Sequence, residues 1–255
     1  MKLILITAGV AGLIGLGFVF KNNSSKKHAE VKSLTGSYTP VAVLELFTSE
    51  GCSSCPPADN LLPQLAKLDS NIIPLSFHVD YWNRLGWTDP FSSSEFSERQ
   101  RKYGDQFHLE GVYTPQLVIN GEYELVGSNR NSATSTIKKV LTEKAAVKIN
   151  IDEVKKNGNK LLVTCSAEGD LENLDLLAAL VQKQAVMNVK AGENNGAKLS
   201  HTNVVRSFAK QTAVQKTSFT LEIPSSITDN NWQLIIYAQQ KNDLKITGAA
   251  EYKNK

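Results

Sequence analysis

The feature that most constrains this chain is a pair of cysteines set between a strand-like run and a helix-like run. Residues 41–47 (VAVLELF) are apolar and partly β-branched, which is typical of a buried strand. Residues 58–68 carry leucines along one helical stripe. Between them, Gly51 breaks the chain direction and the motif Cys52-Ser-Ser-Cys55 follows. The sequence therefore predicts both thiols at a strand-to-helix turn.

The position of the pair indicates redox chemistry. The thiolate, not the thiol, attacks a disulfide, and the positive end of a helix dipole lowers a thiol pKa. Cys52 is therefore predicted to be the attacking thiol, and Cys55, one turn later, to resolve the mixed disulfide. The chain has only three cysteines, too few for a disulfide-rich scaffold, and we expect the third, Cys165, to be buried and inert.

Two other uses of the thiol pair remain open. Soft thiolates suit Cu(I), so Cys52, Cys55 and a distant histidine, His78, could bind a soft metal. Alternatively, a permanently closed bridge could staple a non-catalytic binding module, and an inaccessible Cys52 would favour that alternative. No second close pair of Cys or His residues completes a structural zinc site. No cofactor is predicted.

The first half of the chain is predicted to form a mixed sheet covered by helices. The turn signals and periodicity place a strand at 71–79, a helix from the N-cap Ser92 with Glu95 as a capping box, strands within 116–126 joined by an Asn120-Gly121 turn, and a helix at 129–144.

The pattern changes at about residue 146. Runs such as KINIDEV, KLLVTCSA, LDLLAALVQ, TSFTLEI and WQLIIYAQ read as short strands separated by polar turns. These runs predict a β-sandwich-like C-terminal domain over residues 146–255, after a first domain at 39–145. Such a β-rich half suits partner binding.

The N-terminus predicts export. Lys2 is followed by 18 uncharged residues, so residues 1–20 are expected to be a signal peptide or a membrane anchor, and residues 21–38 a polar tether. We expect the body of the protein in the periplasm or outside the cell, where a thiol pair can cycle between its oxidised and reduced forms.

The net charge of the chain is only +3, with acidic and basic residues mixed, which does not favour a nucleic-acid partner. The expected partners are protein thiols or disulfides.

Further candidates lie near the predicted strand ends. Thr114-Pro115 precedes a strand, and a cis bond there would expose a backbone edge to an extended peptide. Asp80 could relay protons near Cys55. Trp82 and Trp87 could line a groove or serve as packing anchors, and Asp89 could form a turn. A solvated helix face is expected to carry Arg99, Arg101 and Tyr103. The connecting segment that follows is expected to leave His108 exposed.

A polar network between the two halves of the chain is expected from four residues of the C-terminal motif: Glu193, His201, Asn203 and Arg206.

The quoted motifs also carry a resemblance. ELFTSEGCSSCPPAD, SFHVDYWNRLGWTDPF, ERQRKYG and GVYTPQLVING, with GENNGAKLSHTNVVR later, resemble the secreted thioredoxin-like family called domain of unknown function 1223. The resemblance implies an α/β thioredoxin-like domain with a helical insertion, followed by the added β-rich domain. In that superfamily the proline loop faces the cysteine pair. We therefore expect an exported thiol–disulfide oxidoreductase whose site holds Cys52, Cys55, Thr114, Pro115 and Asp80.

Overall fold

The structure, a computed structural model, describes residues 38–254 and begins its main sheet with β1 (Ala42–Thr48). All seven residues of β1 are buried, as the apolar run predicts. The elements that follow in this half are α1 (Pro56–Leu65), β2 (Ile72–His78), the short 3-10 helix η1 (Asn83–Leu85), α2 (Ser94–Gln106), β3 (Gln116–Ile119), β4 (Tyr123–Val126) and α3 (Arg130–Val140).

Side-chain caps fix where the longer helices start. Ser93, one residue after the predicted N-cap Ser92, accepts the Glu95 backbone N–H at 3.2 Å and opens α2. Asn129 accepts the Ser132 N–H at 3.1 Å and opens α3. The predicted hairpin at Asn120-Gly121 is confirmed between β3 and β4, with both residues at positive φ.

The C-terminal half is formed by strands. They are β5 (Val147–Asn157), β6 (Lys160–Gly169), β7 (Leu174–Asn188), β8 (Lys198–Thr212), β9 (Lys216–Glu222), β10 (Trp232–Gln240) and β11 (Ile246–Lys253). Five of them were predicted from apolar runs. Strands β8 and β11 were not, because polar residues interrupt the apolar pattern of both.

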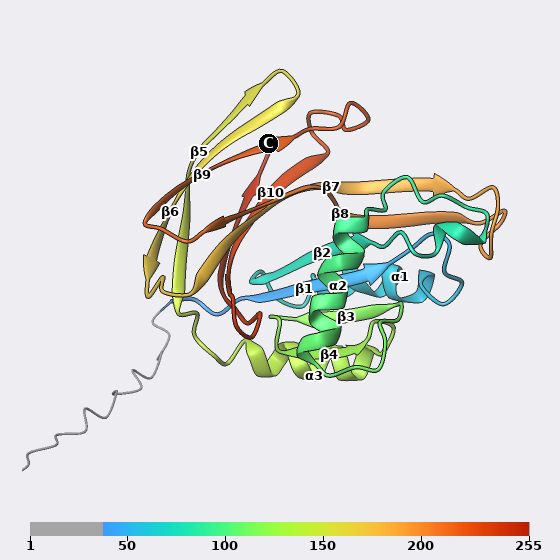
Figure 1. Ribbon diagram of the computed structural model, residues 1–255, viewed down its shortest axis with the longest axis horizontal. Helices are drawn as coiled ribbons and strands as arrows, with labels where there is room; N and C mark the ends of the chain where they lie inside the picture. The colour runs from blue at the N-terminus through green and yellow to red at the C-terminus, as the bar shows by residue number, and fades with distance from the viewer. Residues whose placement is uncertain (1–37, 255) are drawn as a thin grey trace, which may run out of the picture. The chain divides into compact units, whose positions relative to one another are not determined.

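Strands from both halves join one eight-stranded mixed sheet, in the order β11-β10-β7-β8-β2-β1-β3-β4 (Figure 1). A second sheet, β5-β6-β9, has three strands. The predicted fold class, an α/β thioredoxin-like domain followed by a β-sandwich-like C-terminal domain, is therefore wrong. The described residues are mostly β, with three short α-helices. The error follows from β8, the unpredicted strand that pairs with β2 and continues the sheet.

The seam between β2 and β8 has little backbone pairing. One residue pair, Ser76 and Val204, is in register across these parallel strands. Side chains add to it: the Ser76 hydroxyl donates to the Thr202 carbonyl at 2.8 Å, and the Asn203 amide donates to the Pro74 carbonyl at 3.0 Å. Packing therefore has to hold the seam.

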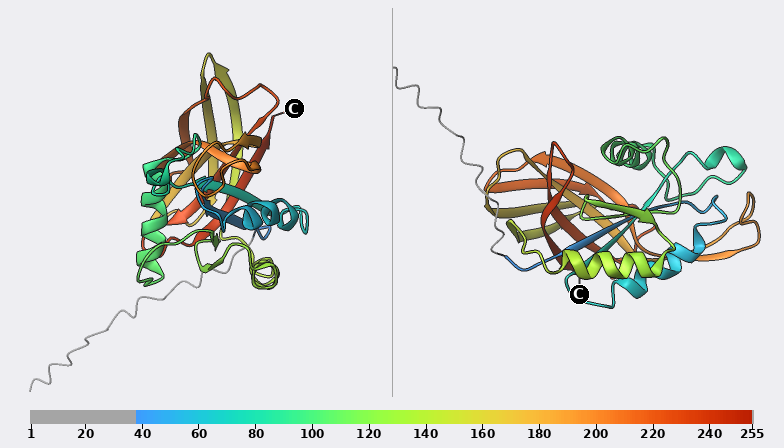
Figure 2. Two further views of the ribbon diagram at one scale, coloured as in Figure 1. Left: turned by 90° about the vertical axis from the view of Figure 1, so that its right-hand side faces the viewer. Right: turned by 90° about the horizontal axis from the view of Figure 1, so that it is seen from below.

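Successive side chains of a strand point to opposite faces of the large sheet, and both faces are covered by other elements. One face is covered by α2, and its apolar core contains residues of β1, β2, β7, β8 and β10. On the opposite face, α1 and α3 cover the β1 end, and the three-stranded sheet covers β7 and β10. Figure 2 shows α2 on one side of the sheet and α1 and α3 on the other.

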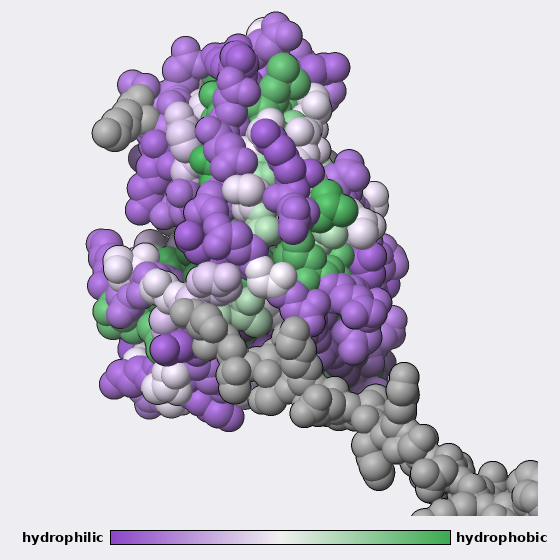
Figure 3. Space-filling view, turned by 90° about the vertical axis from the view of Figure 1, so that its left-hand side faces the viewer, coloured by the Kyte–Doolittle hydropathy of each residue, from purple (hydrophilic) through white to green (hydrophobic). Residues whose placement is uncertain are grey.

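The outer face of the three-stranded sheet is polar. Strand β9 alternates strictly between exposed and buried residues, so its polar residues point outward. Figure 3 looks onto the side of the molecule that carries these strands, and most of that face is hydrophilic. Among the described helices, none is long and apolar enough to cross a membrane. The predicted signal or anchor at 1–20 and the tether up to residue 37 lie outside the described residues.

A buried ion pair lies within the core on the α2 side of the sheet. Glu45 of β1 is fully buried, and Arg99 of α2 contacts its carboxylate through Nη2 at 2.7 Å and Nε at 3.0 Å. The hydroxyls of Tyr103 and Tyr237 also donate to this carboxylate. The sequence predicted a solvated helix face for these residues. That prediction is wrong for Arg99 and Tyr103, whose side chains contact the buried Glu45 carboxylate. The ion pair connects β1, α2 and β10.

We expect Arg99→Met to lower the free energy of unfolding by about 3 kcal/mol or more, because the Glu45 carboxylate would stay buried without its cation. Urea unfolding at pH 7 measures this value. The control is Arg101→Met, which removes an exposed pair with Glu98 and should cost less than about 0.5 kcal/mol. Equal losses in the two variants would contradict the importance of the buried pair.

Candidate functional site

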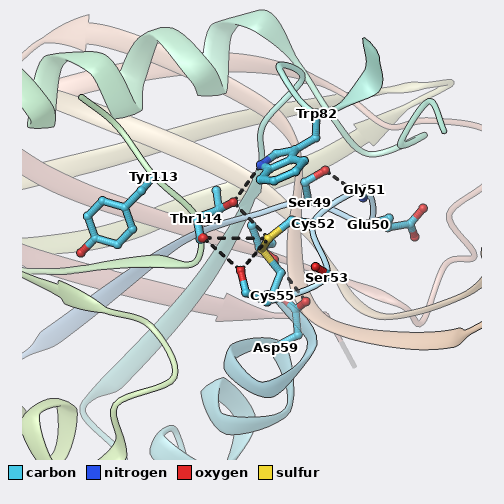
Figure 4. Close-up of a disulfide and its surroundings, with 12 residues drawn as sticks. Ser49, Glu50, Gly51, Cys52, Ser53, Cys55, Asp59, Trp82, Tyr113 and Thr114 are labelled. Atoms are coloured by element: carbon cyan, nitrogen blue, oxygen red, sulfur yellow. Dashed lines mark hydrogen bonds between the residues drawn. A yellow bond between two sulfur atoms is a disulfide. The ribbon is translucent and has the colours of Figure 1, made fainter. Parts of the chain in front are cut away.

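The two cysteines lie in the turn that connects β1 to α1, and a disulfide bond joins them (Figure 4). The Cys52 N–H donates to the Ser49 carbonyl, and the Cys55 N–H donates to the Cys52 carbonyl, both at 3.2 Å. Cys55 is the N-cap residue of α1. The strand-to-helix position of the pair, expected from the sequence, is confirmed.

Hydroxyl groups surround the sulfur of Cys52. The Thr114 hydroxyl donates to Cys52 Sγ at 3.2 Å, and Trp82 Nε1 donates to that same hydroxyl oxygen at 2.8 Å. Because Trp82 uses a lone pair of this oxygen, the hydroxyl proton is free to point at the sulfur. Ser54 Oγ also lies 3.3 Å from Cys52 Sγ, but the Ser54 hydroxyl donates to the Thr114 carbonyl at 3.3 Å. Among residues 38–254, no hydrogen bond reaches the sulfur of Cys55, so the two sulfurs differ.

The loop before Pro115 is held in place from α2. The Thr114–Pro115 peptide bond is cis, as predicted. The Gln100 side-chain amide donates to the Tyr113 carbonyl at 2.7 Å and to Gln116 Oε1 at 2.9 Å. This anchoring positions Thr114 against the disulfide.

The helix start supplies fewer backbone donors than the sequence suggested. Pro56 and Pro57 occupy the first two helical positions and have no N–H groups. The stabilisation of a thiolate at Cys52 would therefore come mainly from the Thr114 hydroxyl, and not from free N–H groups of α1. Both cysteines are fully buried, at 0% exposure.

A loop from the far half of the chain contacts the cysteine turn. It connects β7 to β8. Its Glu193 carboxylate accepts the Ser53 N–H at 3.0 Å, and the Asn194 amide donates to the carbonyls of Glu50 and Cys52 at 2.8 and 2.9 Å. The bond from Ser53 lowers the pKa of Glu193. These hydrogen bonds anchor the cysteine turn to the β7–β8 loop.

Beside the disulfide lies a group of buried ionisable side chains, here called the buried charge cluster: Glu50, Asp59, His78, Asp89 and His201. His201 Nε2 lies 3.3 Å from Glu50 Oε1, and His201 Nδ1 lies 3.7 Å from Asp59 Oδ2. Neither contact is aligned as a hydrogen bond. His78 Nδ1 lies 2.6 Å from Asp89 Oδ2, and the two imidazole rings pack edge to face at 4.7 Å.

Each histidine of this cluster faces a carboxylate. Burial opposes a charged His201, but Asp59 and Glu50 outweigh it and raise the pKa of His201 to about 10. Burial also opposes a charged Asp89, yet His78 and two backbone N–H groups lower the pKa of Asp89. His201 is therefore a cation at neutral pH, placed between two carboxylates.

Comparison with known proteins identifies the family. The family described as protein of unknown function (DUF1223) matches residues 43–239. The chain belongs to the DUF1223 family. No curated protein matches the chain.

Two solved structures are similar over most of the chain. A structural-genomics protein from Agrobacterium tumefaciens shares 28% sequence identity, with a TM-score of 0.64 over 86% of this chain and 97% of that one. HBP35 of Porphyromonas gingivalis shares 16% identity, with a TM-score of 0.61 over 86% of this chain and 76% of that one, and shows the fold alone.

The structure does not bring every predicted site residue to the cysteines. Asp80 bonds to Ser97 of α2, through its N–H at 3.0 Å and its Oδ1 at 2.5 Å, and so holds α2. His78 contacts Asp89 and the ring of His201, not the thiols. In the part of the chain that the structure describes, no group of three or more His, Cys, Asp or Glu side chains is arranged to hold a metal ion.

Other sequence predictions have clear outcomes. His108 is exposed, as expected. Cys165 is buried and free, and burial with nearby Asp152 raises its pKa to about 11, which fits an inert thiol. Trp87 Nε1 donates to Glu50 Oε2 at 2.8 Å, so this tryptophan supports the buried charge cluster.

Three residues of the cluster were not placed near the cysteine turn by the sequence analysis. Asp59 could have been found, because it follows Cys55 by four residues and so shares its helix face. Glu50 lies two residues before Cys52, but its burial is not visible in the sequence. His201 was noted only as part of a network, since β8 itself was not predicted.

We expect the protein to lose stability as the pH rises from about 6.5 toward 10, because the raised pKa of His201 adds stability that is complete below its ordinary value of 6.5. The loss between pH 6 and 9 should be about 2 kcal/mol larger in the wild type than in His201→Gln. Urea unfolding at both pH values measures it. His108→Gln, at an exposed site, should keep the wild-type slope, and an unchanged slope in His201→Gln would contradict the assignment.

Proposed function

We propose that this DUF1223 protein catalyses thiol–disulfide exchange through Cys52 and Cys55, with protein thiols or disulfides as partners. The observation that carries the proposal is the difference between the two sulfurs. Cys52 Sγ accepts the Thr114 hydroxyl, which Trp82 orients, whereas Cys55 Sγ has no hydrogen-bond donor among the described residues. Donors of this kind stabilise a thiolate at Cys52.

The exchange balances as follows. A substrate thiolate attacks Cys52 Sγ, a mixed disulfide forms, and Cys55 leaves as a thiolate that takes up a proton. The second substrate thiolate then attacks the substrate sulfur of the mixed disulfide, and Cys52 leaves as a thiolate held by Thr114. The substrate dithiol loses two electrons and the protein disulfide gains them. The reverse sequence reduces a substrate disulfide.

The proposed setting is outside the cytoplasm. The expected export signal or anchor at 1–20 and the closed Cys52–Cys55 bridge both suit an oxidising compartment. Ser53 and Ser54 are exposed between the two cysteines, so a partner can reach the turn beside the buried sulfurs. Exposure of Cys52 then requires a local opening of the contacts made by Trp82 or the β7–β8 loop.

A second candidate function is a binding module with a structural disulfide. The full burial of Cys52 favours it, because a permanently shielded bridge needs no opening. The loop contacts of Glu193 and Asn194 would then serve only to hold the turn. The two candidates differ in whether external thiols reach Cys52.

We expect the reduced wild-type protein to exchange with a disulfide-linked peptide, and Cys52→Ser to abolish the reaction, because the serine hydroxyl is not a comparable nucleophile. Release of the reduced peptide, followed by mass spectrometry, measures it. Cys165→Ser, at the buried free thiol, is the matched control and should keep wild-type activity. Equal activity of wild type and Cys52→Ser, or no exchange and no reduction of the native bridge by dithiothreitol, rejects the proposal in favour of a structural disulfide.

We expect Thr114→Val to raise the pKa of Cys52 in the reduced protein by about one unit, because a hydrogen bond to a charged group contributes about 1.5 kcal/mol. The rate of alkylation by iodoacetamide as a function of pH gives this pKa. Thr114→Ser keeps the hydroxyl and is the control, with the wild-type value expected. The same pKa in Thr114→Val as in the wild type would show that the Thr114 hydroxyl does not stabilise the thiolate.

A further inference from the structure

The β7–β8 loop, residues 189–197, holds the backbone of the cysteine turn on both sides of Cys52. The Asn194 amide donates to the Glu50 and Cys52 carbonyls at 2.8 and 2.9 Å. The Ser53 N–H donates to the Glu193 carboxylate at 3.0 Å. These bonds join positions 140 or more residues apart in the chain. The conformation of the turn therefore depends on a distant segment.

These bonds bear directly on the access of a partner to Cys52. The Cys52 carbonyl accepts the Cys55 N–H at 3.2 Å as well as the Asn194 amide. The Cys52 side chain is fully buried, although the next two residues, Ser53 and Ser54, are exposed. Because the surface lies one residue away, a rotation of the turn backbone would bring the Cys52 sulfur to solvent. That rotation requires the bonds from the loop to break.

Two elements cover the turn, and the loop is held less firmly than the other, Trp82. Trp82 packs against the apolar core on the α2 side of the sheet and donates to the Thr114 hydroxyl, and Figure 4 shows both residues on the sulfur side of Cys52. In the loop, by contrast, none of residues 190–197 is buried, and Glu193 is exposed. Segments without buried apolar contacts open at the lowest cost in free energy.

The tip of the loop can move while its base stays in place. The Gly196 N–H donates to the Val189 carbonyl and the Val189 N–H donates to the Ala197 carbonyl, both at 2.9 Å, so the base is closed on itself. Gly192, which precedes Glu193, has a φ of 71° and gives the backbone at the start of the tip its conformational freedom. Release of the turn therefore does not require β7 and β8 to separate.

From these contacts we propose that the β7–β8 loop is an autoinhibitory clasp on the cysteine turn. While Glu193 and Asn194 hold the turn, Cys52 is shielded; when they let go, an external thiol reaches its sulfur. The proposal deepens the proposed function and rests on it where it assigns the loop to the regulation of thiol–disulfide exchange. A segment from the C-terminal half of the chain thereby controls the reactivity of a disulfide in the N-terminal half.

The test measures how fast dithiothreitol reduces the native bridge of the folded protein at pH 8, with acid quenching, alkylation and mass spectrometry. In the double variant Glu193→Ala/Asn194→Ala we expect reduction at least tenfold faster than in the wild type. The variant lacks three hydrogen bonds of the closed form, and a tenfold change corresponds to about 1.4 kcal/mol in their sum. The matched control is Asn195→Ala, at an exposed side chain of the same loop, which should keep the wild-type rate.

Cys165 distinguishes local release of the loop from unfolding of the whole protein. Its thiol is free and fully buried in β6. Labelling of this thiol by iodoacetamide in the oxidised protein, without reductant, should therefore be equally slow in the wild type and the double variant. Labelling that accelerates as much as reduction would mean that the variant unfolds globally, and would overturn the proposal.

The other outcomes separate this proposal from the proposed function. Equal reduction rates in the wild type and the double variant overturn the clasp, and so does a wild-type bridge reduced as fast as the bridge of the urea-unfolded chain. If the double variant is reduced faster but no variant exchanges with the disulfide-linked peptide, the loop still controls access and the proposed function falls. If exchange proceeds while the reduction rates are equal, the proposed function stands and the loop has no such role.

Discussion

The structure depends most on the ion pair between Glu45 and Arg99. Glu45 lies in the middle of β1 on the face that packs against α2, and its partners in the neighbouring strands, Leu75 and Val118, are apolar. Burial of this carboxylate without a counter-charge would be costly. Arg99 neutralises it from α2, and Tyr237 donates to it from β10. Aromatic rings of Phe77, Tyr103, Phe208 and Tyr237 surround the guanidinium. One interaction thus joins a central strand, its covering helix and the distant half of the chain.

Strand β8 connects this architecture to the candidate site. It closes the seam with β2, and the same strand supplies His201 to the buried charge cluster. The loop that precedes β8 supplies Glu193 and Asn194 to the cysteine turn. Formation of the eight-stranded sheet therefore assembles the surroundings of the disulfide, and neither half of the chain contains the complete site.

Much of the local structure follows from the sequence. The apolar run of β1, the Asn120-Gly121 hairpin and the helix after the cysteines were predicted because each depends on residues adjacent in the chain. The cis bond before Pro115 was predicted from the preceding C-x-x-C pair and the order of the elements, since a proline at a strand start is by itself compatible with a trans bond. The fold class was not predicted. Polar residues interrupt the alternating apolar pattern of β8, so this strand was not recognised. Its parallel pairing with β2, which extends the sheet, joins residues far apart in the sequence and leaves no local sequence pattern.

The sequence by itself determined where the cysteines lie, which elements flank them and that the two sulfurs are close enough to bond, since a spacing of three residues at a helix start fixes those features. Only the tertiary structure decided what surrounds them. Burial of Cys52, the Thr114 hydroxyl on its sulfur, the β7–β8 loop on its turn and the imidazolium of His201 all come from contacts across many residues. Burial and pairing change the charge state of a side chain, and a linear pattern does not contain either.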